Sequence, residues 1–447
     1  MTLFGKAVGV GAIVLVFTTF AVPQEKMVLT LEESIRLALL QNPFLLAEKA
    51  KEDQASSMVR AAFAGFLPNL TAVGTDVLDK KVFTVVLPSF IPDQPPQSFK
   101  LDFTRKYQLA LNFSLPLSAG GRLVSGYKQA KLNLMSAREG IRLSQQETVF
   151  NVKRAFYGYL LSRKFAEVAG EAVNLAEKHF QNVKSLYDVG MASKFDLLRS
   201  EVQVANLKPQ LIRAKNGLSV AELALKNLIG VDLNQLVEIR GELQVPASEV
   251  DPESSVSRAL AGRPELTQLK YQQQMASEML KMARGAHFPA LGLAGQYNYW
   301  GNQFKFGKDN WESYYSINLV LAFPIFDGFL NSAKVGESKA MVRQLEYSQK
   351  GMSEMVKFEV REAILNLQQA KEALSSQGKT VEEAQEAVRI AELNYKEGLA
   401  TNLDVSSAHV ALSQARTNYS QALYDCVIAL AQLEKATGSS QDVSLEK

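Results

Sequence analysis

The stretches YDVGMASKFD at 187–196 and YKEGLATNLD at 395–404 have Tyr, Gly, Ala and Asp at the same places, and each matching pair is 208 residues apart. The same spacing relates other residues: Pro116 to Pro324, Gly120 to Gly328, Val152 to Val360 and Gly230 to Gly438. Nearer the amino terminus the spacing is 221 residues, as between Pro68 and Pro289, so the first half holds 13 additional residues there. They belong to a segment with Pro88, Pro92, Pro95 and Pro96, which is therefore expected to be an irregular, exposed loop. A spacing kept over more than 100 residues indicates an internally duplicated chain.

Long helical patterns lie on both sides of the two stretches. Residues 117–208 and 325–447 contain no proline and are rich in Ala, Leu, Glu, Lys and Gln, with apolar residues three and four apart. A helix of this kind would be roughly 100 Å long at 1.5 Å per residue, which favours a coiled-coil or helical-barrel assembly. The predicted helices are about 122–187 and 194–229 in the first half, and about 329–395 and 403–437 in the second.

Before each long helix, the hydrophobic period changes to two. Tyr107, Leu109 and Leu111 alternate with Gln108, Ala110 and Asn112, and a similar alternation precedes Pro324. Stretches of about ten residues with one wholly apolar face are typical of membrane β-barrel strands. The predicted strands are about 69–80, 104–116, 290–301 and 312–324. Aromatic residues gather near their ends, as at a membrane interface: Phe103, Tyr299, Trp300, Trp311 and Tyr314.

The alternation alone would also suit a soluble sheet packed on helices. Two features favour the membrane: the helices are too long to cover so small a sheet, and the amino terminus is of the secretory kind. Val8 to Val22 is an apolar run of about 15 residues, shorter than the roughly 18 to 20 that cross a bilayer. Near the end of this run, Thr19-Phe20-Ala21 has small residues at the places of a cleavage site, so residues 1–21 are predicted to be a signal peptide, with a membrane anchor as the alternative.

These patterns divide the chain into a first repeat at 22–230, a linker at 231–255 and a second repeat at 256–447. In each repeat a short helix, two strands, a very long helix, a glycine turn and a returning helix follow one another. Four strands cannot close a barrel, and open strand edges are not tolerated in lipid. Several chains are therefore expected to close one barrel together.

Composition excludes many other functions. Lys and Arg number 49 against 46 for Asp and Glu, so no basic surplus is present to bind nucleic acid. One cysteine and three scattered histidines match no common metal-ligand spacing. Arg361-Glu362 and Lys371-Glu372 are typical of solvated helix faces. We therefore expect no catalytic residues, no metal site and no cofactor.

The two repeats, the paired strands, the long helices and the turns at 187–196 and 395–404 together resemble the TolC-type outer membrane efflux proteins. The resemblance covers nearly the whole mature chain. It implies an α+β membrane channel, a homotrimer whose twelve strands form one barrel in outer membrane lipid, continued by an α-helical barrel across the periplasm of a Gram-negative-type cell. It also implies partners, a periplasmic adaptor protein and an inner-membrane pump, and passive transport rather than chemistry.

The resemblance also assigns site residues. Tyr395 and Asp404 match the family's places for a gate tyrosine and a constricting aspartate, and Tyr187 and Asp196 are their counterparts in the first repeat. The chain departs from the most acidic members at Ser407, where a second aspartate would stand. Asp404 could instead be an acidic residue favoured by a helix amino terminus.

The turns themselves are the expected adaptor-docking surface, with a plain helix–helix turn as the alternative. The residues assigned to it are Val189, Gly190, Met191, Ala192, Gly398 and Leu399. The sequence thus favours a trimeric outer membrane channel of a tripartite efflux pump or a type I secretion system. The alternative is a surface adhesin or envelope spacer built from coiled coils. The exported substrate is not indicated.

Overall fold

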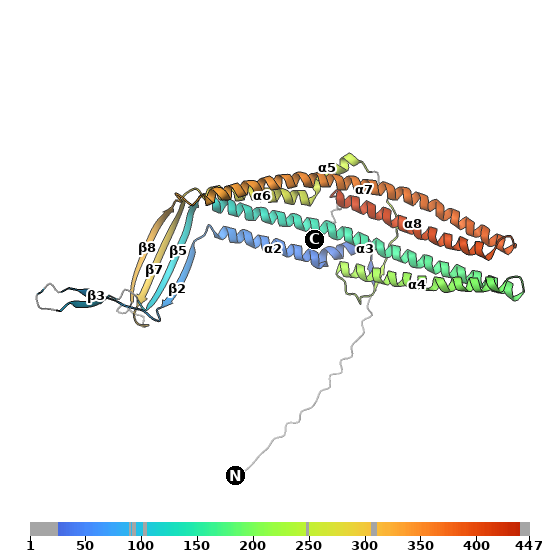
Figure 1. Ribbon diagram of the computed structural model, residues 1–447, viewed down its shortest axis with the longest axis horizontal. Coiled ribbons are helices and arrows are strands. Elements are labelled where there is room, and N and C mark those ends of the chain that lie inside the picture. Colours follow the sequence, from blue (N-terminus) through green and yellow to red (C-terminus); the bar gives the residue numbers. More distant parts are fainter. Residues whose placement is uncertain are drawn as a thin grey trace, which may run out of the picture.

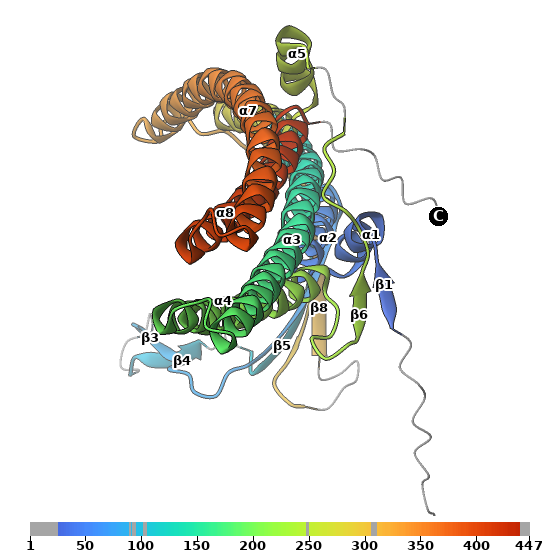
Figure 2. The ribbon, with the colours of Figure 1, turned by 90° about the vertical axis from the view of Figure 1, so that its right-hand side faces the viewer.

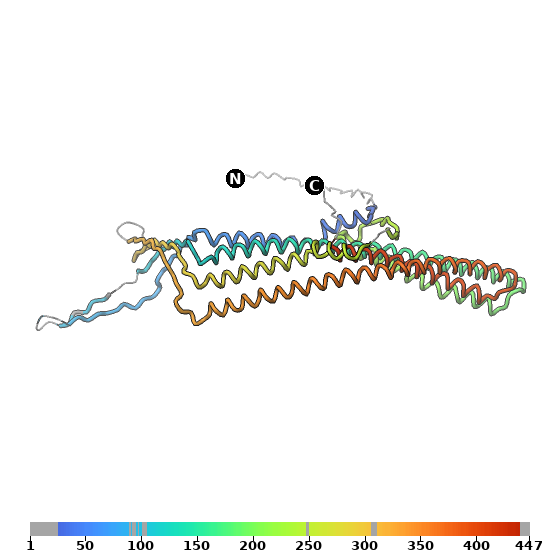
Figure 3. Tube along the Cα trace, turned by 90° about the horizontal axis from the view of Figure 1, so that it is seen from above, coloured from blue at the N-terminus to red at the C-terminus, as the bar shows by residue number. Residues whose placement is uncertain are grey.

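The computed structural model describes residues 26–88, 91, 95–101, 105–246, 250–304 and 311–438. The predicted signal peptide at 1–21 and Phe103 lie outside them. The described chain is a long rod with a β-sheet at one end and two helical hairpins at the other (Figure 1). Figure 3 shows the two long helices running nearly the whole length of the helical part.

The helices follow the duplicated pattern. The two long helices, α3 and α7, each contain 67 residues. Their ends differ by at most one residue from the ranges expected from sequence, since the glycine turns at 190 and 398 stop both helices. The helices of the first repeat are α1 (Leu31–Gln41), α2 (Pro43–Ala64), α3 (Arg122–Asp188) and α4 (Lys194–Ile229). Those of the second repeat are α5 (Pro252–Gly262), α6 (Pro264–Gly285), α7 (Leu330–Lys396) and α8 (Asn402–Ala436).

Local chemistry explains where the shorter helices begin and end. Pro43 and Pro264 stand at the first positions of α2 and α6, where no backbone N–H is needed. The Asn42 side chain caps α2 by accepting hydrogen bonds from the Phe44 and Leu45 N–H groups, at 2.9 and 3.2 Å. At the other end of the repeat, α4 stops at Gly230, whose φ of 75° few other residues adopt.

The helices form one curved layer instead of a closed bundle, as the view along the rod shows (Figure 2). In the half next to the sheet, the order of contacts is α2, α3, α6 and α7. In the half next to the hairpin tips, it is α4, α3, α8 and α7. The layer therefore has two free edges, with α2 and α4 on one and α7 on the other. Both edges expose apolar side chains, among them Ile212 on α4 and Phe358 and Leu365 on α7.

The main sheet has the strand order β2–β5–β7–β8, and all three pairings are antiparallel. Strands β2 and β8 are its edges, and they continue the two free edges of the helical layer. A bulge at Pro116 and Ser118 shifts the β5–β7 register close to the helices. The strands are β2 (Asn69–Asp76), β5 (Tyr107–Ala119), β7 (Ala290–Gly301) and β8 (Trp311–Ala322).

Two small strand pairs do not appear in the sequence-based expectation. The segment around Pro88 was expected to be irregular, but β3 (Phe83–Leu87) and β4 (Gln97–Leu101) form an antiparallel hairpin. This hairpin projects beyond the sheet (Figure 3). Within the expected linker at 231–255, β6 (Val237–Ile239) pairs in parallel with β1 (Met27–Leu29).

Two equivalent apolar cores hold the middle of the rod together. Val152 on α3 and Val360 on α7 are fully buried, and 208 residues separate them. Ala38 on α1 and Ala259 on α5 are likewise fully buried, at the 221-residue spacing. In each repeat a short helix thus packs on the centre of the long helix and on the end of the returning one. The duplication seen in the sequence is a duplication of core packing.

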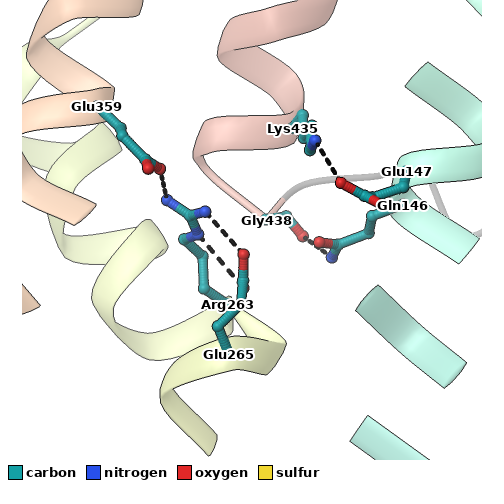
Figure 4. A network of polar contacts seen from close by, with 7 residues as sticks. All are labelled: Gln146, Glu147, Arg263, Glu265, Glu359, Lys435 and Gly438. Carbon is teal, nitrogen blue, oxygen red and sulfur yellow. Dashed lines mark hydrogen bonds and ion pairs between the residues drawn. The ribbon is translucent and has the colours of Figure 1, made fainter. Parts of the chain in front are cut away.

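At the same level, polar contacts occur both within the second repeat and between the two repeats (Figure 4). Arg263, before α6, is bound by Glu265 at 2.7 Å and by Glu359 on α7. Between the repeats, Lys435 Nζ of α8 lies 3.1 Å from a carboxylate oxygen of Glu147 on α3. The returning helix of the second repeat is therefore tied to the long helix of the first.

Where the sheet meets the helices, the backbones of the two repeats approach each other closely at two glycines. A Cβ added at Gly120 would lie 2.3 Å from the Gly285 carbonyl oxygen, and one at Gly285 would lie 2.4 Å from the Gly120 oxygen. Gly120 also has a φ of 62°, in the left-handed region. Any side chain at either place would separate β5 from the end of α6.

Candidate functional site: the sheet faces and the hairpin tips

The register of the four-stranded sheet separates apolar from polar side chains. Leu111 on β5 pairs with Tyr297 on β7, which pairs with Tyr315 on β8. Paired residues lie on the same face of a sheet, so this face is apolar on every strand. It is also uncovered, as the 71% exposure of Ile317 shows. The apolar face holds Leu70, Leu109, Leu111, Phe113, Leu293, Tyr297, Tyr315, Ile317 and Leu319.

The opposite face is rich in amides and hydroxyls. Asn298 on β7 is fully buried, and its Oδ1 accepts hydrogen bonds from Gln108 Nε2 at 2.9 Å and from Gln296 Nε2 at 3.3 Å. Thr71, Asn112 and Gln296 are in register on three adjacent strands of this face. The sheet therefore presents one apolar and one polar surface.

Aromatic side chains collect at the end of the sheet away from the helices. The Trp311 ring stacks on Tyr299 with a centroid distance of 4.8 Å, and Trp300 lies 4.9 Å from Tyr314. Glu312 accepts a hydrogen bond from Trp300 Nε1 at 3.1 Å and pairs with Arg105 at 3.3 Å. Amphipathic rings beside charged groups are typical of a membrane–water interface.

At the opposite end of the rod, the two hairpins turn at glycines with positive φ. Gly190 has a φ of 79° and Gly398 one of 73°, and both are exposed. Beside them Met191 and Leu399 are 76% and 80% exposed. The expected docking residues thus form two small apolar surfaces at the tips. Ala192 is half-buried, whereas Phe195, which the sequence analysis did not select, is 69% exposed.

The two expected constriction acids lie in the first turns of the returning helices, where each binds the N-cap residue. Ser193 Oγ donates to the Asp196 carboxylate at 2.6 Å, and Thr401 Oγ1 donates to the Asp404 carboxylate at 2.7 Å. Asp404 also accepts the Thr401 N–H at 2.8 Å, which completes a capping box. The Thr401 hydrogen bonds hold the pKa of Asp404 below its ordinary value. The carboxylate is exposed and charged at neutral pH.

Asn402 connects the two hairpins behind the tips. Its Nδ2 donates to the main-chain oxygen of Asp196 on α4 at 2.9 Å, while its Oδ1 faces His179 Nε2 on α3 at 2.7 Å. The His179 ring lies 5.4 Å from the ring of Tyr395 on α7. Burial raises the pKa of Tyr395, and the charge of Asp196 raises it further, so this phenol is neutral at physiological pH.

The structure therefore brings two of the four expected gate residues, Tyr395 and Asp196, to the contact between the hairpins. Asp404 lies two residues after Asn402, with its carboxylate exposed and bound to Thr401. Tyr187 does not join them; its ring instead lies 5.9 Å from Lys194 Nζ within the first hairpin.

His179, Asn402 and His409 were missed by the sequence analysis, which treated the histidines as scattered. One signal was available for two of them. Asn402 and His409 are seven residues apart on α8, with buried Val405 and Ser406 between them, so all four lie on one buried helix face.

None of the described helices is long and apolar enough to span a bilayer. No cluster of three or more His, Cys, Asp or Glu side chains suited to a metal ion occurs in the described ranges.

A sheet with one apolar and one polar face, joined to a helical layer far longer than itself, defines the class of outer membrane channel subunits. The family pattern described as "Outer membrane efflux protein" matches residues 34–231 and 255–439. The chain belongs to this family. The resemblance inferred from the turns and repeats is thereby confirmed, together with the outer membrane location.

The chain is also similar to individual proteins. It is 22% identical to the outer membrane protein TolC of Vibrio cholerae over 426 residues, which cover 92% of each chain. It is 25% identical to the alkaline protease secretion protein AprF of Pseudomonas aeruginosa, over 72% of this chain and 68% of AprF. Among solved structures, VceC of Vibrio cholerae has a TM-score of 0.74 and 17% identity, covering 91% of this chain and 96% of VceC.

Proposed function

We propose that three copies of the chain close a twelve-stranded barrel in the outer membrane, continued into the periplasm by a helical tunnel. The observation that carries this proposal is the in-register division of the sheet into an apolar and a polar face. An apolar face would meet lipid, and a polar face would line water, as in membrane barrels. The unpaired edges β2 and β8 require partners, because open edges do not occur in lipid.

The helical layer supports the same assembly. Its edges continue those of the sheet, and exposed apolar side chains such as Phe358 on α7 and Ile212 on α4 lie along them. Since large exposed apolar surfaces mark interaction sites, each edge would pack against the next copy. Three copies of the rod, joined edge to edge in this way, would enclose a tunnel that ends at the hairpin tips.

We propose that this tunnel is the passive exit duct of a tripartite efflux pump or a type I secretion system. The relatives include a protein named for alkaline protease secretion and, in Pseudomonas putida, one named for toluene efflux. The exposed tip residues around Gly190 and Gly398 would receive a periplasmic adaptor attached to an inner-membrane pump. Tyr395, Asp196 and Asp404 would form the gate where the tunnel narrows.

The alternative, a coiled-coil adhesin or spacer, has no observation in its favour. A spacer does not require a sheet whose second face carries Thr71, Asn112 and Gln296 in register. Planar bilayer recording of the purified protein distinguishes the two. A channel gives discrete conductance steps, whereas a spacer leaves the bilayer electrically silent; a monomeric mass in detergent would also refute the proposal.

A further inference from the structure

Two buried histidines lie where the two hairpins of one chain meet. His179 on α3 is 7% exposed, His409 on α8 is 9% exposed, and their ring centroids are 5.9 Å apart. Apolar side chains would pack these helices together without the cost of burying polar groups. The pair therefore calls for an explanation beyond packing, and the two rings are the only histidines placed at this contact among the described residues.

The hydrogen bonds determine where each ring carries its proton. Because Asn402 Nδ2 must donate to the Asp196 main-chain oxygen, Asn402 Oδ1 is the atom that faces His179 Nε2. His179 Nε2 is therefore the donor, and Nδ1 is the atom free to take up a second proton. Similarly, His409 Nε2 lies 2.9 Å from a Glu392 carboxylate oxygen, to which it donates. Both rings can meet these contacts in the neutral form.

The titratable groups that face His179 come from two neighbouring helices: His409 on α8, and Glu392 and Tyr395 on α7. On α4, the Asp196 carboxylate is held by Ser193 and acts on Tyr395. Burial lowers the pKa of His179 most strongly; the Asn402 hydrogen bond opposes this, His409 lowers the pKa further and Glu392 raises it. The net direction is downward, so the closed contact favours a neutral ring.

We propose that His179 and His409, with Asn402 and Glu392, form a proton-sensitive latch that holds α8 against α3 at neutral pH and loosens when the tip side becomes acidic. We call these four residues the histidine latch. The inference rests on the proposed function in one respect, because it places the latch at the entrance of the tunnel. It differs from a fixed gate in that the pH of the surrounding solution would set how readily the hairpins part.

The sign of the effect follows from linkage. A histidine that is harder to protonate in the closed contact stabilises that contact fully above its ordinary pKa of about 6.5. This stabilisation is lost as the pH falls below that value. The ratio of closed to open tips then decreases by up to about tenfold for each pH unit. Acidification from pH 7.5 to 5.5 should therefore open the tips, whereas a change from 8.5 to 7.5 should have little effect.

Planar bilayer recording with acidification of the tip side tests the latch. The open fraction should rise severalfold between pH 7.5 and 5.5 in the unaltered protein. His179→Gln keeps a side-chain N–H for Asn402 but does not titrate near neutrality, so its open fraction should no longer depend on pH. His287→Gln is the matched control, because His287 is exposed at the end of α6 and should leave the pH dependence intact.

A second measurement does not depend on conductance. Spin labels on Met191→Cys and Leu399→Cys, in a chain whose only cysteine is changed by Cys426→Ala, report distances between the tips. The distribution should move to longer distances at pH 5.5, but not when His179→Gln is also present. Unchanged distances, or an equal shift with His179→Gln, would overturn the latch. A silent bilayer together with pH-dependent distances would instead refute the channel proposal and leave the latch standing.

Discussion

Replacement of Leu111 by Arg tests whether the apolar face of the sheet meets lipid. Leu111 lies on the central strand β5, between Ala72 of β2 and Tyr297 of β7. An Arg there would place a charge on the face that we propose to be embedded. The neighbouring Asn112 faces the other way, so Asn112→Arg is a matched control on the same strand.

The depth of Leu111 sets the expected magnitude. Leu111 is four residues from Tyr107, whose ring stacks near Trp311 at the aromatic end of the sheet. At a rise of about 3.3 Å per residue and a tilt of about 40°, Leu111 lies roughly 10 Å inside the aromatic level. An apolar band about 25 Å tall has its midplane near this depth, where an Arg costs about 2–4 kcal/mol.

The depth argument makes a further distinction. Leu319 is eight residues from Trp311 on β8, roughly 20 Å along the membrane normal by the same geometry and hence near the opposite interface. Leu319→Arg should therefore cost only about 0–1 kcal/mol per chain. The unfolding free energies of Asn112→Arg and Leu319→Arg should therefore be close to that of the unaltered protein. The unfolding free energy of Leu111→Arg should be well below it.

Guanidinium unfolding from lipid vesicles measures these costs. The sequence contains two tryptophans, Trp300 and Trp311, and both belong to the sheet, so their fluorescence reports on it directly. Equal losses of unfolding free energy for Leu111→Arg and Asn112→Arg would show that the two faces do not differ in environment. The lipid-facing assignment would then be wrong.

Three further outcomes are expected. Asp404→Asn, which keeps the hydrogen-bond acceptor for Thr401, should lower cation preference; an unchanged reversal potential in a salt gradient would exclude an axial carboxylate. Ala192→Trp should abolish export but leave a detergent-resistant trimer, as export assays and gel mobility can show, and normal export would rule out docking there. Gly120→Ala should lower the unfolding free energy by more than about 1 kcal/mol, because a left-handed backbone is strained with a Cβ and the carbonyl of Gly285 lies in its way; Gly121→Ala, with a similar φ but open space, should cost less.

The sequence predicts the long elements well because their signals are local and repeated. A proline-free stretch ending in glycine leaves little freedom in where α3 and α7 stop, and the expected α7 range of about 329–395 is displaced by one residue from Leu330–Lys396. The β7 range, Ala290–Gly301, coincides with the range expected from the alternation. By contrast, β5 continues to Ala119 rather than ending near 116, because a bulge accommodates Pro116 within the strand.

Contacts between distant parts of the chain had no comparable signal. Strand β6 has three residues, and its partner β1 lies about two hundred residues earlier, so neither shows a period. The four prolines at 88, 92, 95 and 96 suggested an irregular loop, yet β3 and β4 pair on either side of them, since proline is tolerated beyond strand ends. His179 and His409 meet only because α8 folds back against α3.

The unequal lengths of the edge strands have a consequence for how such an assembly would come apart. Strand β2 has eight residues and β8 has twelve, so in a ring of copies at least four residues of β8 find no ladder partner at each seam. Inside one chain, β7 and β8 are paired along all twelve residues. Heating should therefore split the ring at its three seams first, releasing single chains whose four-stranded sheets are still intact.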